Sequence, residues 1–253
     1  MGVIIKNDDK LVPTFLSTIE KQTYNKKLIA MQINMCGDSA QTKEKIKKWV
    51  AENKPKYLRL DYVDSNPTSE PLAANSQERF KKFGEIKNDY LAKTNKLSCN
   101  YCAIIESDAF LADHTLKTLV ALDKPILAPM LMPIPEANDP YRNFFAAVTD
   151  TGYYKDDPSY GPIAERKKIG TFKVPLVNRV YLIKAEHTPQ LSFLGNGNQW
   201  EFIAFSNDAR KKNIDQYITN EKEFGSLLHF FKTPTEQEMK NFTFVFDNAK
   251  SKK

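Results

Sequence analysis

The stretch Tyr101-Cys-Ala-Ile-Ile-Glu-Ser-Asp-Ala-Phe-Leu111 decides the fold. Its apolar residues, Tyr101 to Ile105, predict a buried strand, and Glu106 and Asp108 follow directly. In open α/β sheets, ligands bind beyond the carboxyl ends of the parallel strands. Two carboxylates at that place can hold Mn²⁺ or Mg²⁺, and such a cation neutralises a substrate diphosphate. Acidic pairs also end strands without any metal, so this motif alone leaves both interpretations open.

Strands and helices alternate on the amino-terminal side of this stretch. The predicted order is strand 3–5, helix 13–20, strand 27–33, turn 37–39, helix 42–51, strand 57–63, loop 64–77, helix 77–93 and strand 101–105. Such an order predicts a parallel sheet with right-handed crossovers. We therefore expect an α/β fold with a mostly parallel, Rossmann-like sheet.

The carboxyl-terminal side has a different character. A helix at 114–122 and a strand at 125–130 are followed by dense prolines and clustered aromatic residues. This composition predicts a mixed β region packed on the first sheet, with a late strand at 177–183 and a helix around 200–212. No linker or repeat divides the chain, so we expect one domain over residues 1–253. Its parts are a nucleotide-binding half at 1–111, an acceptor- and sugar-binding half at 112–245, and a tail at 246–253.

Composition narrows the class of protein. The 253 residues are 41% hydrophobic and 27% charged, which is typical of a globular domain. The net charge is +6, but only 6 of the 37 basic residues are Arg. Nucleic-acid readers usually depend on Arg, so the Lys-rich surplus favours a solubilising surface and no nucleic-acid partner. A nucleic-acid-binding protein stays an alternative that the charge alone supports.

Cysteines and termini bear on the compartment. Cys36, Cys99 and Cys102 are too few for a secreted disulfide scaffold, and Cys102 reads as a core residue rather than a redox or zinc ligand. Neither a signal peptide nor an apolar run of roughly 18 residues is found, so we expect no membrane span. These features predict a cytoplasmic protein, in the host cytoplasm if the source is viral.

The order of half-sheet, acidic motif and aromatic second half is the layout of a GT-A glycosyltransferase, whose DxD motif bridges a metal to a nucleotide-sugar. From end to end, the chain resembles the procollagen galactosyltransferases of glycosyltransferase family 25 and the related domains of lysyl hydroxylases. The matching stretches are Lys6-Asn7 with Pro13, 79–87, 101–111, 125–131, Tyr141-Arg-Asn-Phe-Phe145, Gly152-Tyr-Tyr154, 170–177, Phe202-Ile-Ala-Phe-Ser206 and Glu223-Phe-Gly225.

The resemblance implies a GT-A fold that uses a UDP-sugar and Mn²⁺, with Mg²⁺ as an alternative. It implies inverting transfer of a hexose, galactose or glucose, to a protein or glycan acceptor such as hydroxylysine of a collagen-like chain. The implied metal ligands are Glu106, Asp108 and, as a third, His229. The implied nucleotide-sugar contacts have separate roles: the nucleotide for Asn7, the uridine or ribose for Asp38, the diphosphate for Arg79 and Lys87, and the sugar pocket for Asn143, Tyr153 and Tyr154.

Each of these residues also has a structural interpretation. Arg79 and Lys87 would solvate a helix face, Asn7 would cap a helix, and Asp38 would close a turn. The tyrosines at 153 and 154 would be core aromatics with a satisfied hydroxyl, and His229 would be an exposed or loosely packed histidine.

Two departures from the family pattern affect the expected activity. Glu106 replaces the leading aspartate of the DxD motif. The place of an aspartate pair reads Gly197-Asn-Gln-Trp-Glu201, so Glu201 or Asp208 would have to serve as the catalytic base. The second hypothesis is therefore a catalytically silent GT-A-like domain that acts as a binding or scaffold module.

Overall fold

The structure, a computed structural model, describes residues 1–6, 10–65, 76–134, 141–195 and 199–228. Its α-helices are α1 (Val12–Glu20), α2 (Ala40–Asn53), α3 (Gln77–Lys96), α4 (Thr115–Leu122), α5 (Tyr160–Ala164) and α6 (Glu201–Lys211). The main sheet contains β1 (Gly2–Ile5), β2 (Ala30–Met35), β3 (Arg59–Asp64), β4 (Tyr101–Glu106), β6 (Ile126–Pro129), β11 (Thr171–Val174), β13 (Val180–Lys184) and β14 (Gln216–Thr219).

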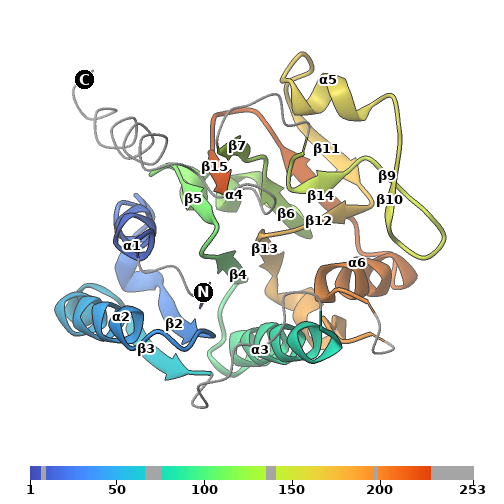
Figure 1. Cartoon of the computed structure of the whole chain (residues 1–253). Helices are drawn as coiled ribbons and strands as arrows, with labels where there is room; N and C mark the ends of the chain where they lie inside the picture. The colour runs from blue at the N-terminus through green and yellow to red at the C-terminus, as the bar shows by residue number, and fades with distance from the viewer. Residues whose placement is uncertain (7–9, 66–75, 135–140, 196–198, 229–253) are drawn as a thin grey trace.

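The main sheet is continuous across the two halves of the chain, in the order β11-β14-β6-β13-β4-β1-β2-β3 (Figure 1). The four strands β4, β1, β2 and β3 are parallel, as the alternation of strands and helices predicts. Next to them, β13 runs antiparallel to both β4 and β6, while β14 is parallel to β6. The predicted α/β fold with a mixed second half is therefore confirmed.

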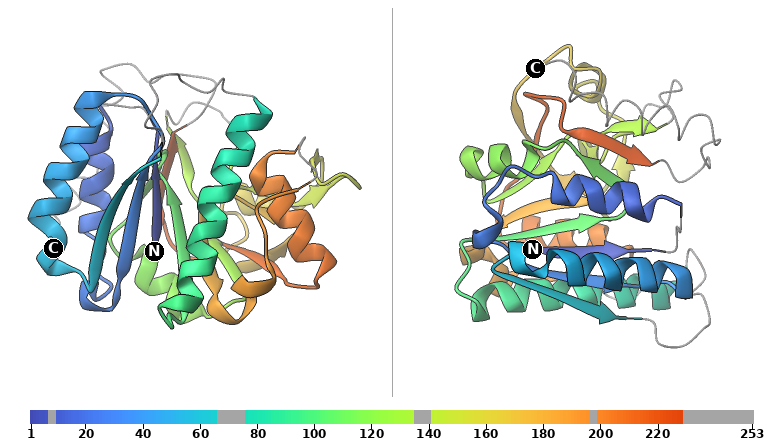
Figure 2. Two further views of the ribbon diagram at one scale, coloured as in Figure 1. Left: turned by 90° about the horizontal axis from the view of Figure 1, so that it is seen from below. Right: turned by 90° about the vertical axis from the view of Figure 1, so that its left-hand side faces the viewer.

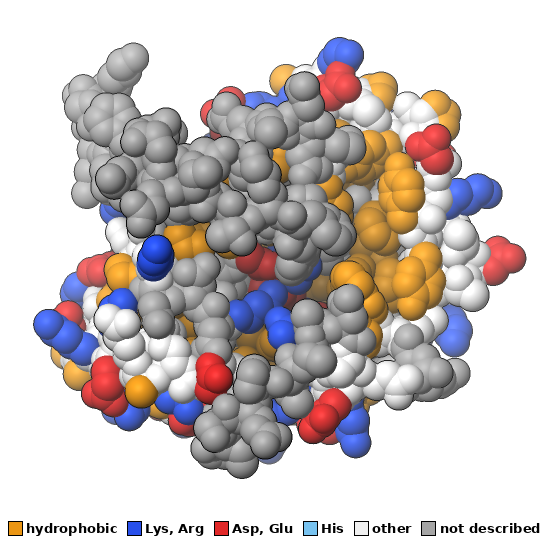
Figure 3. Space-filling model, viewed as in Figure 1, with side chains coloured by type: hydrophobic (Ala, Val, Ile, Leu, Met, Phe, Trp, Pro, Cys, Tyr) orange, Lys and Arg blue, Asp and Glu red, His pale blue; other side chains and the backbone are white. Residues whose placement is uncertain are grey.

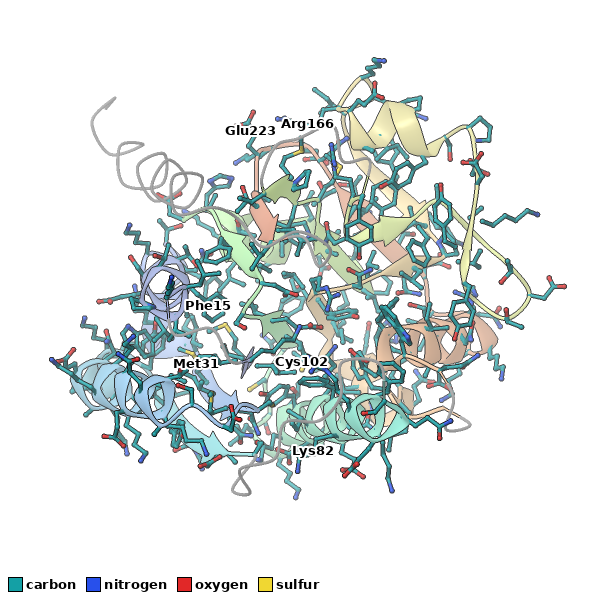
Figure 4. The ribbon with its side chains drawn as sticks, in the orientation of Figure 1. Phe15, Met31, Lys82, Cys102, Arg166 and Glu223 are labelled. Atoms are coloured by element: carbon teal, nitrogen blue, oxygen red, sulfur yellow. The ribbon has the colours of Figure 1, made fainter. Side chains whose placement is uncertain are left out.

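Helices cover both faces of this sheet (Figure 2). Alternate residues of β1 explain how: Val3 and Ile5 pack in one cluster with α1, α2 and α4, whereas Ile4 packs in a second cluster with α3 and α6. Phe15 and Met31 belong to the first cluster and Cys102 to the second (Figure 4). Cys102 is buried and unpaired, which confirms it as a core residue.

Small sheets complete the second half. A three-stranded sheet joins β5 (Ala109–Leu111), β15 (Gly225–Leu228) and β7 (Met132–Ile134), and two-stranded pairs join β8 (Phe144–Phe145) to β12 (Leu176–Val177) and β9 (Ala147–Val148) to β10 (Tyr154–Lys155). Gly225 has φ +132°, and a Cβ there would lie 2.0 Å from the carbonyl oxygen of Phe110. Only glycine fits this approach of β15 to β5.

Three predicted strands differ from the observed ones. The predicted strand at 27–33 begins late because Lys26–Leu28 forms a 3₁₀ turn that the Asn25 side chain caps. A second 3₁₀ turn, Lys54–Lys56, precedes β3, which begins at Arg59 instead of the predicted residue 57. The predicted strand at 177–183 is divided into β12 and β13, because the chain turns at Asn178-Arg179 and Arg179 adopts φ +69°. In the described ranges, no helix combines the length and the apolarity that crossing a bilayer requires.

Candidate active site

The ends of β1 and β4 are joined at the carboxyl edge of the sheet. The backbone N–H of Lys6, just after β1, donates to the Ser107 hydroxyl at 3.1 Å. In return, the Ser107 N–H donates to the Ile4 carbonyl at 2.9 Å. These bonds fix Glu106-Ser107-Asp108 beside the end of the neighbouring parallel strand. This is the edge at which α/β sheets bind ligands.

Charged side chains converge on Glu106, which is 3% exposed. Its Oε1 accepts from the Lys87 ammonium at 2.7 Å, and its Oε2 accepts from Lys6 at 2.9 Å and from Arg179 at 2.7 Å. Asp108 is buried next to it, and its Oδ2 lies 3.3 Å from the Lys6 Nζ and 3.6 Å from the Arg179 Nε. Basic and acidic side chains meet near the centre of the face shown in Figure 3.

Lys87 extends this cluster to helix α6. Its side chain is fully buried, and its ammonium also contacts Glu201 Oε1 at 3.0 Å. Glu201 is the first residue of α6, where a carboxylate interacts favourably with the helix dipole. The structure therefore connects Glu106, from the acidic motif, to Glu201, one of the two predicted bases, through one lysine. The alternative that Lys87 solvates a helix face is wrong.

Sequence reasoning missed two residues of the site, Lys6 and Arg179. Arg179 was the harder of the two to find. Its guanidinium is buried against both Glu106 and Asp108, and its carbonyl accepts from the Glu106 N–H at 3.1 Å. A non-glycine residue at φ +69° is uncommon and is held there by its surroundings. The signal in the sequence was the polar pair Asn178-Arg179, which interrupts an otherwise apolar strand.

The cluster favours the charged forms of Glu106, Lys87 and Arg179. Burial alone would raise the pKa of Glu106, but Lys6, Lys87 and Arg179 together hold that pKa well below its ordinary value. Burial would likewise lower the pKa of Lys87, yet the Glu106 and Glu201 carboxylates outweigh it and raise the pKa. The same balance, with Asp108 and Glu106 as the partners, raises the pKa of Arg179.

Asp108 Oδ1 is the oxygen of this site through which a metal would bind. Asp108 Oδ1 is buried and accepts no hydrogen bond from the described residues. Both oxygens of Glu106 contact cations of the protein. Within the described ranges, no three His, Cys, Asp or Glu side chains gather as a metal site, and the predicted third ligand His229 lies outside those ranges. The donor set fits a divalent cation through Asp108, with Glu106 beside it.

The predicted diphosphate and nucleotide contacts lie around this edge. Arg79 stacks over the Phe83 ring, with its guanidinium carbon 5.1 Å from the ring centroid. Asp38 is half-buried in the turn that follows β2. Burial raises the pKa of the neighbouring Cys36 thiol to about 12, although the charges of Lys6, Lys82 and Arg79 act to lower it. Asn7 lies outside the described residues.

The predicted sugar-pocket residues are placed differently from one another. Asn143 is fully buried, and its amide accepts from Leu131 N–H at 2.9 Å and donates to the Pro129 carbonyl at 2.9 Å. Tyr153 and Tyr154 are 41% and 48% exposed, so the alternative that they are core aromatics is wrong.

The second predicted base is engaged elsewhere. Asp208 accepts from the Ser192 N–H at 2.9 Å and pairs with Lys212 at 2.8 Å. These contacts attach the chain after Gln190 to the outer part of α6. The structure brings Glu201, and not Asp208, to the cluster around Glu106.

The sequence model of the N-terminal domain of glycosyltransferase family 25 matches residues 1–245. Human procollagen galactosyltransferase 2 is 28% identical over 243 residues, 90% of this chain and 38% of that protein. A glycosyltransferase 25 family member of Aedes aegypti is 27% identical over 92% of this chain and 40% of its own length. The probable inactive glycosyltransferase 25 family member 3 of Bos taurus is 25% identical over 90% of this chain and 40% of its length. The chain thus spans about two fifths of these relatives.

Solved structures share the fold. GalNAc-T7 with UDP, GalNAc and Mn²⁺ has a TM-score of 0.58 at 14% identity, covering 96% of this chain and 47% of that one. The mannosyltransferase PcManGT of Pyrobaculum calidifontis, with GDP-Man and Mn²⁺, has a TM-score of 0.55 at 17% identity, covering 99% and 63%. The predicted GT-A fold and the resemblance to the procollagen galactosyltransferases are both confirmed.

Proposed function

The chain belongs to glycosyltransferase family 25, and we propose that it transfers a hexose, galactose or glucose, from a UDP-sugar to an acceptor hydroxyl with inversion. The observation that carries this proposal is the pair Glu106 and Asp108 at the carboxyl end of β4, linked through Lys87 to Glu201. Names of relatives support the choice of sugar and acceptor, since several are procollagen galactosyltransferases. Hydroxylysine of a collagen-like protein is the acceptor to test first.

The transfer makes one bond and breaks one. The acceptor oxygen bonds to the anomeric carbon from the face opposite the diphosphate, and the bond from that carbon to the diphosphate oxygen breaks. The acceptor proton passes to a base, and UDP leaves with the electron pair of the broken bond. We assign the base to Glu201, because the structure holds its carboxylate beside the cluster while Asp208 is engaged on the outer part of α6.

The other residues bind and orient the donor. Arg79, beside the carboxyl edge of the sheet, would donate charge-assisted hydrogen bonds to the diphosphate. Asp38, after β2, would accept from the uridine or ribose. We propose that Asp108 and Glu106 hold Mn²⁺, or Mg²⁺ as the alternative, and that the metal neutralises charge on the leaving diphosphate. Lys87 keeps Glu106 and Glu201 at a fixed separation.

A panel of UDP-sugars with Mn²⁺ tests this function. UDP release is measured with and without a hydroxylysine peptide, and the melting temperature is measured with UDP and Mn²⁺. We expect release that depends on the peptide and a melting temperature that the ligands raise. Asp108→Ala should abolish that rise, while Lys93→Ala, a control on α3 whose ammonium bonds to Gln32 and Asp89, should keep it. No shift with any nucleotide-sugar would contradict the proposal.

A second candidate function is a catalytically silent binding or scaffold domain. Two observations favour it: a relative from Bos taurus is named probable inactive, and cations of the protein itself pair with all three carboxylates of the cluster. Under this alternative, UDP raises the melting temperature but no UDP-sugar is hydrolysed or transferred. The same panel therefore separates the two functions.

A further inference from the structure

One ammonium bridges the two carboxylates of the acidic motif. Lys6 Nζ lies 2.9 Å from Glu106 Oε2 and 3.3 Å from Asp108 Oδ2. A cation of the protein thus occupies the position between the carboxylates that the proposed function gives to a metal. Any divalent cation that uses both carboxylates has to displace this ammonium.

The side chain of Lys6 is more exposed than those of Lys87 and Arg179, the other two cations of the cluster, so it has more room to move. Its side chain is 21% exposed, against 0% for Lys87 and 6% for Arg179. Its main chain is held in place, because its N–H donates to the Ser107 hydroxyl. A rotation of the side chain alone can therefore release the carboxylates without disturbing the end of β1.

Among the residues that the structure describes, the charges of the cluster cancel. Its ion pairs link three cations, Lys6, Lys87 and Arg179, to three carboxylates, Glu106, Asp108 and Glu201. A divalent cation arriving alone meets no net negative charge, and Lys6 repels it at short range. A cation that arrives with a diphosphate brings the missing negative charge, and that diphosphate also offers the released ammonium a new partner.

Lys6 and Arg79 contact the same aromatic ring. Lys6 Nζ is 5.8 Å from the centroid of the Phe83 ring, and the Arg79 guanidinium is 5.1 Å from the same centroid. Lys6 therefore shares its ring contact with the arginine that the proposed function places at the diphosphate, so a bound diphosphate is the natural new partner of the released ammonium.

We propose that Lys6 is an internal counter-ion that keeps Mn²⁺ out of the Glu106–Asp108 pair until a nucleoside diphosphate arrives, and that its ammonium then moves to the diphosphate. The inference rests on the proposed function, since it concerns the same donor site. It makes the binding of metal and donor interdependent, so the two ligands tighten each other by the same factor.

Direct Mn²⁺ titration tests the inference without any turnover, with free Mn²⁺ followed by its paramagnetic resonance signal, with and without UDP. Wild-type protein should bind Mn²⁺ weakly alone and at least tenfold more tightly with UDP. Lys6→Met should bind Mn²⁺ alone at least tenfold more tightly than wild type and lose most of the effect of UDP. Lys6→Arg, which keeps the charge, should behave like wild type.

Lys82→Met is the matched control. Lys82 lies on α3 near the same edge and also acts on the Cys36 thiol, but within the described residues it has no ion pair with Glu106 or Asp108 (Figure 4). It should leave Mn²⁺ affinity unchanged.

Three results would overturn the inference, and only the last also overturns the proposed function. Equal Mn²⁺ affinity in Lys6→Met and wild type, with UDP binding intact, overturns the role of Lys6 and leaves the proposed function standing. Tight Mn²⁺ binding by wild type without UDP overturns it as well, and this measurement needs no variant to fold. If wild type binds neither UDP nor Mn²⁺ with UDP present, the proposed function fails together with the inference.

Discussion

Replacing Lys87 by Met should destabilise the protein more than any other change of a single lysine at this site. Lys87 is fully buried, and its ammonium lies 2.7 Å from Glu106 and 3.0 Å from Glu201. Methionine has a similar length, so the substitution removes the charge while it leaves most of the packing. The carboxylate of Glu201, which is 7% exposed, then loses its ion-pair partner.

The size of the destabilisation depends on which ion pairs of the cluster remain in the variant. Removing one member of a buried ion pair usually costs about 3–5 kcal/mol, because the other charge is left uncompensated. Glu106 keeps Lys6 and Arg179, so we expect the lower end, about 3 kcal/mol. For a chain of this size, about 1 kcal/mol lowers the melting temperature by about 2–4 °C, which gives a decrease of about 6–12 °C.

Urea unfolding and thermal melting followed by circular dichroism measure this loss. Lys81→Met is the control, since Lys81 lies on the same helix and its ion pair with Glu85, at 3.9 Å, is exposed to solvent. Exposed pairs contribute little to stability, so this variant should unfold like wild type. Adding Glu201→Gln to Lys87→Met should recover part of the loss, because the amide removes the unpaired charge. A Lys87→Met protein as stable as Lys81→Met would refute the reasoning.

Three further predictions concern the base, the backbone and acid. Glu201→Gln should lower kcat about 100-fold or more with little change in the KM for the donor, measured by UDP release. Gly225→Ala should cost more than about 2 kcal/mol in urea unfolding, because its Cβ meets the Phe110 carbonyl, whereas Gly161→Ala, with open space around it, should cost nothing. Glu106 has a lowered pKa in the folded protein, so its stabilising effect is fully present above the ordinary pKa of about 4.3 and is lost as the pH falls towards the lowered pKa. Urea unfolding between pH 3 and 7 should therefore show a smaller decrease in the free energy of unfolding for Glu106→Gln than for wild type.

Local pattern predicted most of the fold. The apolar runs and helical spacings of the first 130 residues are short-range signals, and they located the parallel strands and the main helices. The 3₁₀ turn before β2 was missed because Lys27 and Leu28 join directly to an apolar run and resemble the start of that strand. The division of the late strand was missed because the polar pair Asn178-Arg179 does not by itself show that Arg179 adopts a left-handed backbone.

The site was only partly predictable. Glu106 and Asp108 stand at a strand end, which sequence reveals, but the partners of Lys87 come from positions 19 and 114 residues away. A lysine in a helix is usually solvated, and only the tertiary fold shows that two carboxylates meet it. Asn143 was predicted as a sugar contact, yet its amide already bonds to the backbone at Leu131 and Pro129.

The two departures from the family pattern are joined in the structure. Glutamate stands at 106 where the DxD motif has its first aspartate, and Glu201 is the acidic residue where an aspartate pair was expected. Both contact the same buried ammonium, that of Lys87. An aspartate at 106 would be one methylene shorter, so it could not keep the 2.7 Å contact with Lys87 and also meet Lys6 and Arg179 without a shift of the strand. The longer side chain at 106 and the carboxylate at 201 therefore belong to one arrangement, because both are held by the Lys87 ammonium.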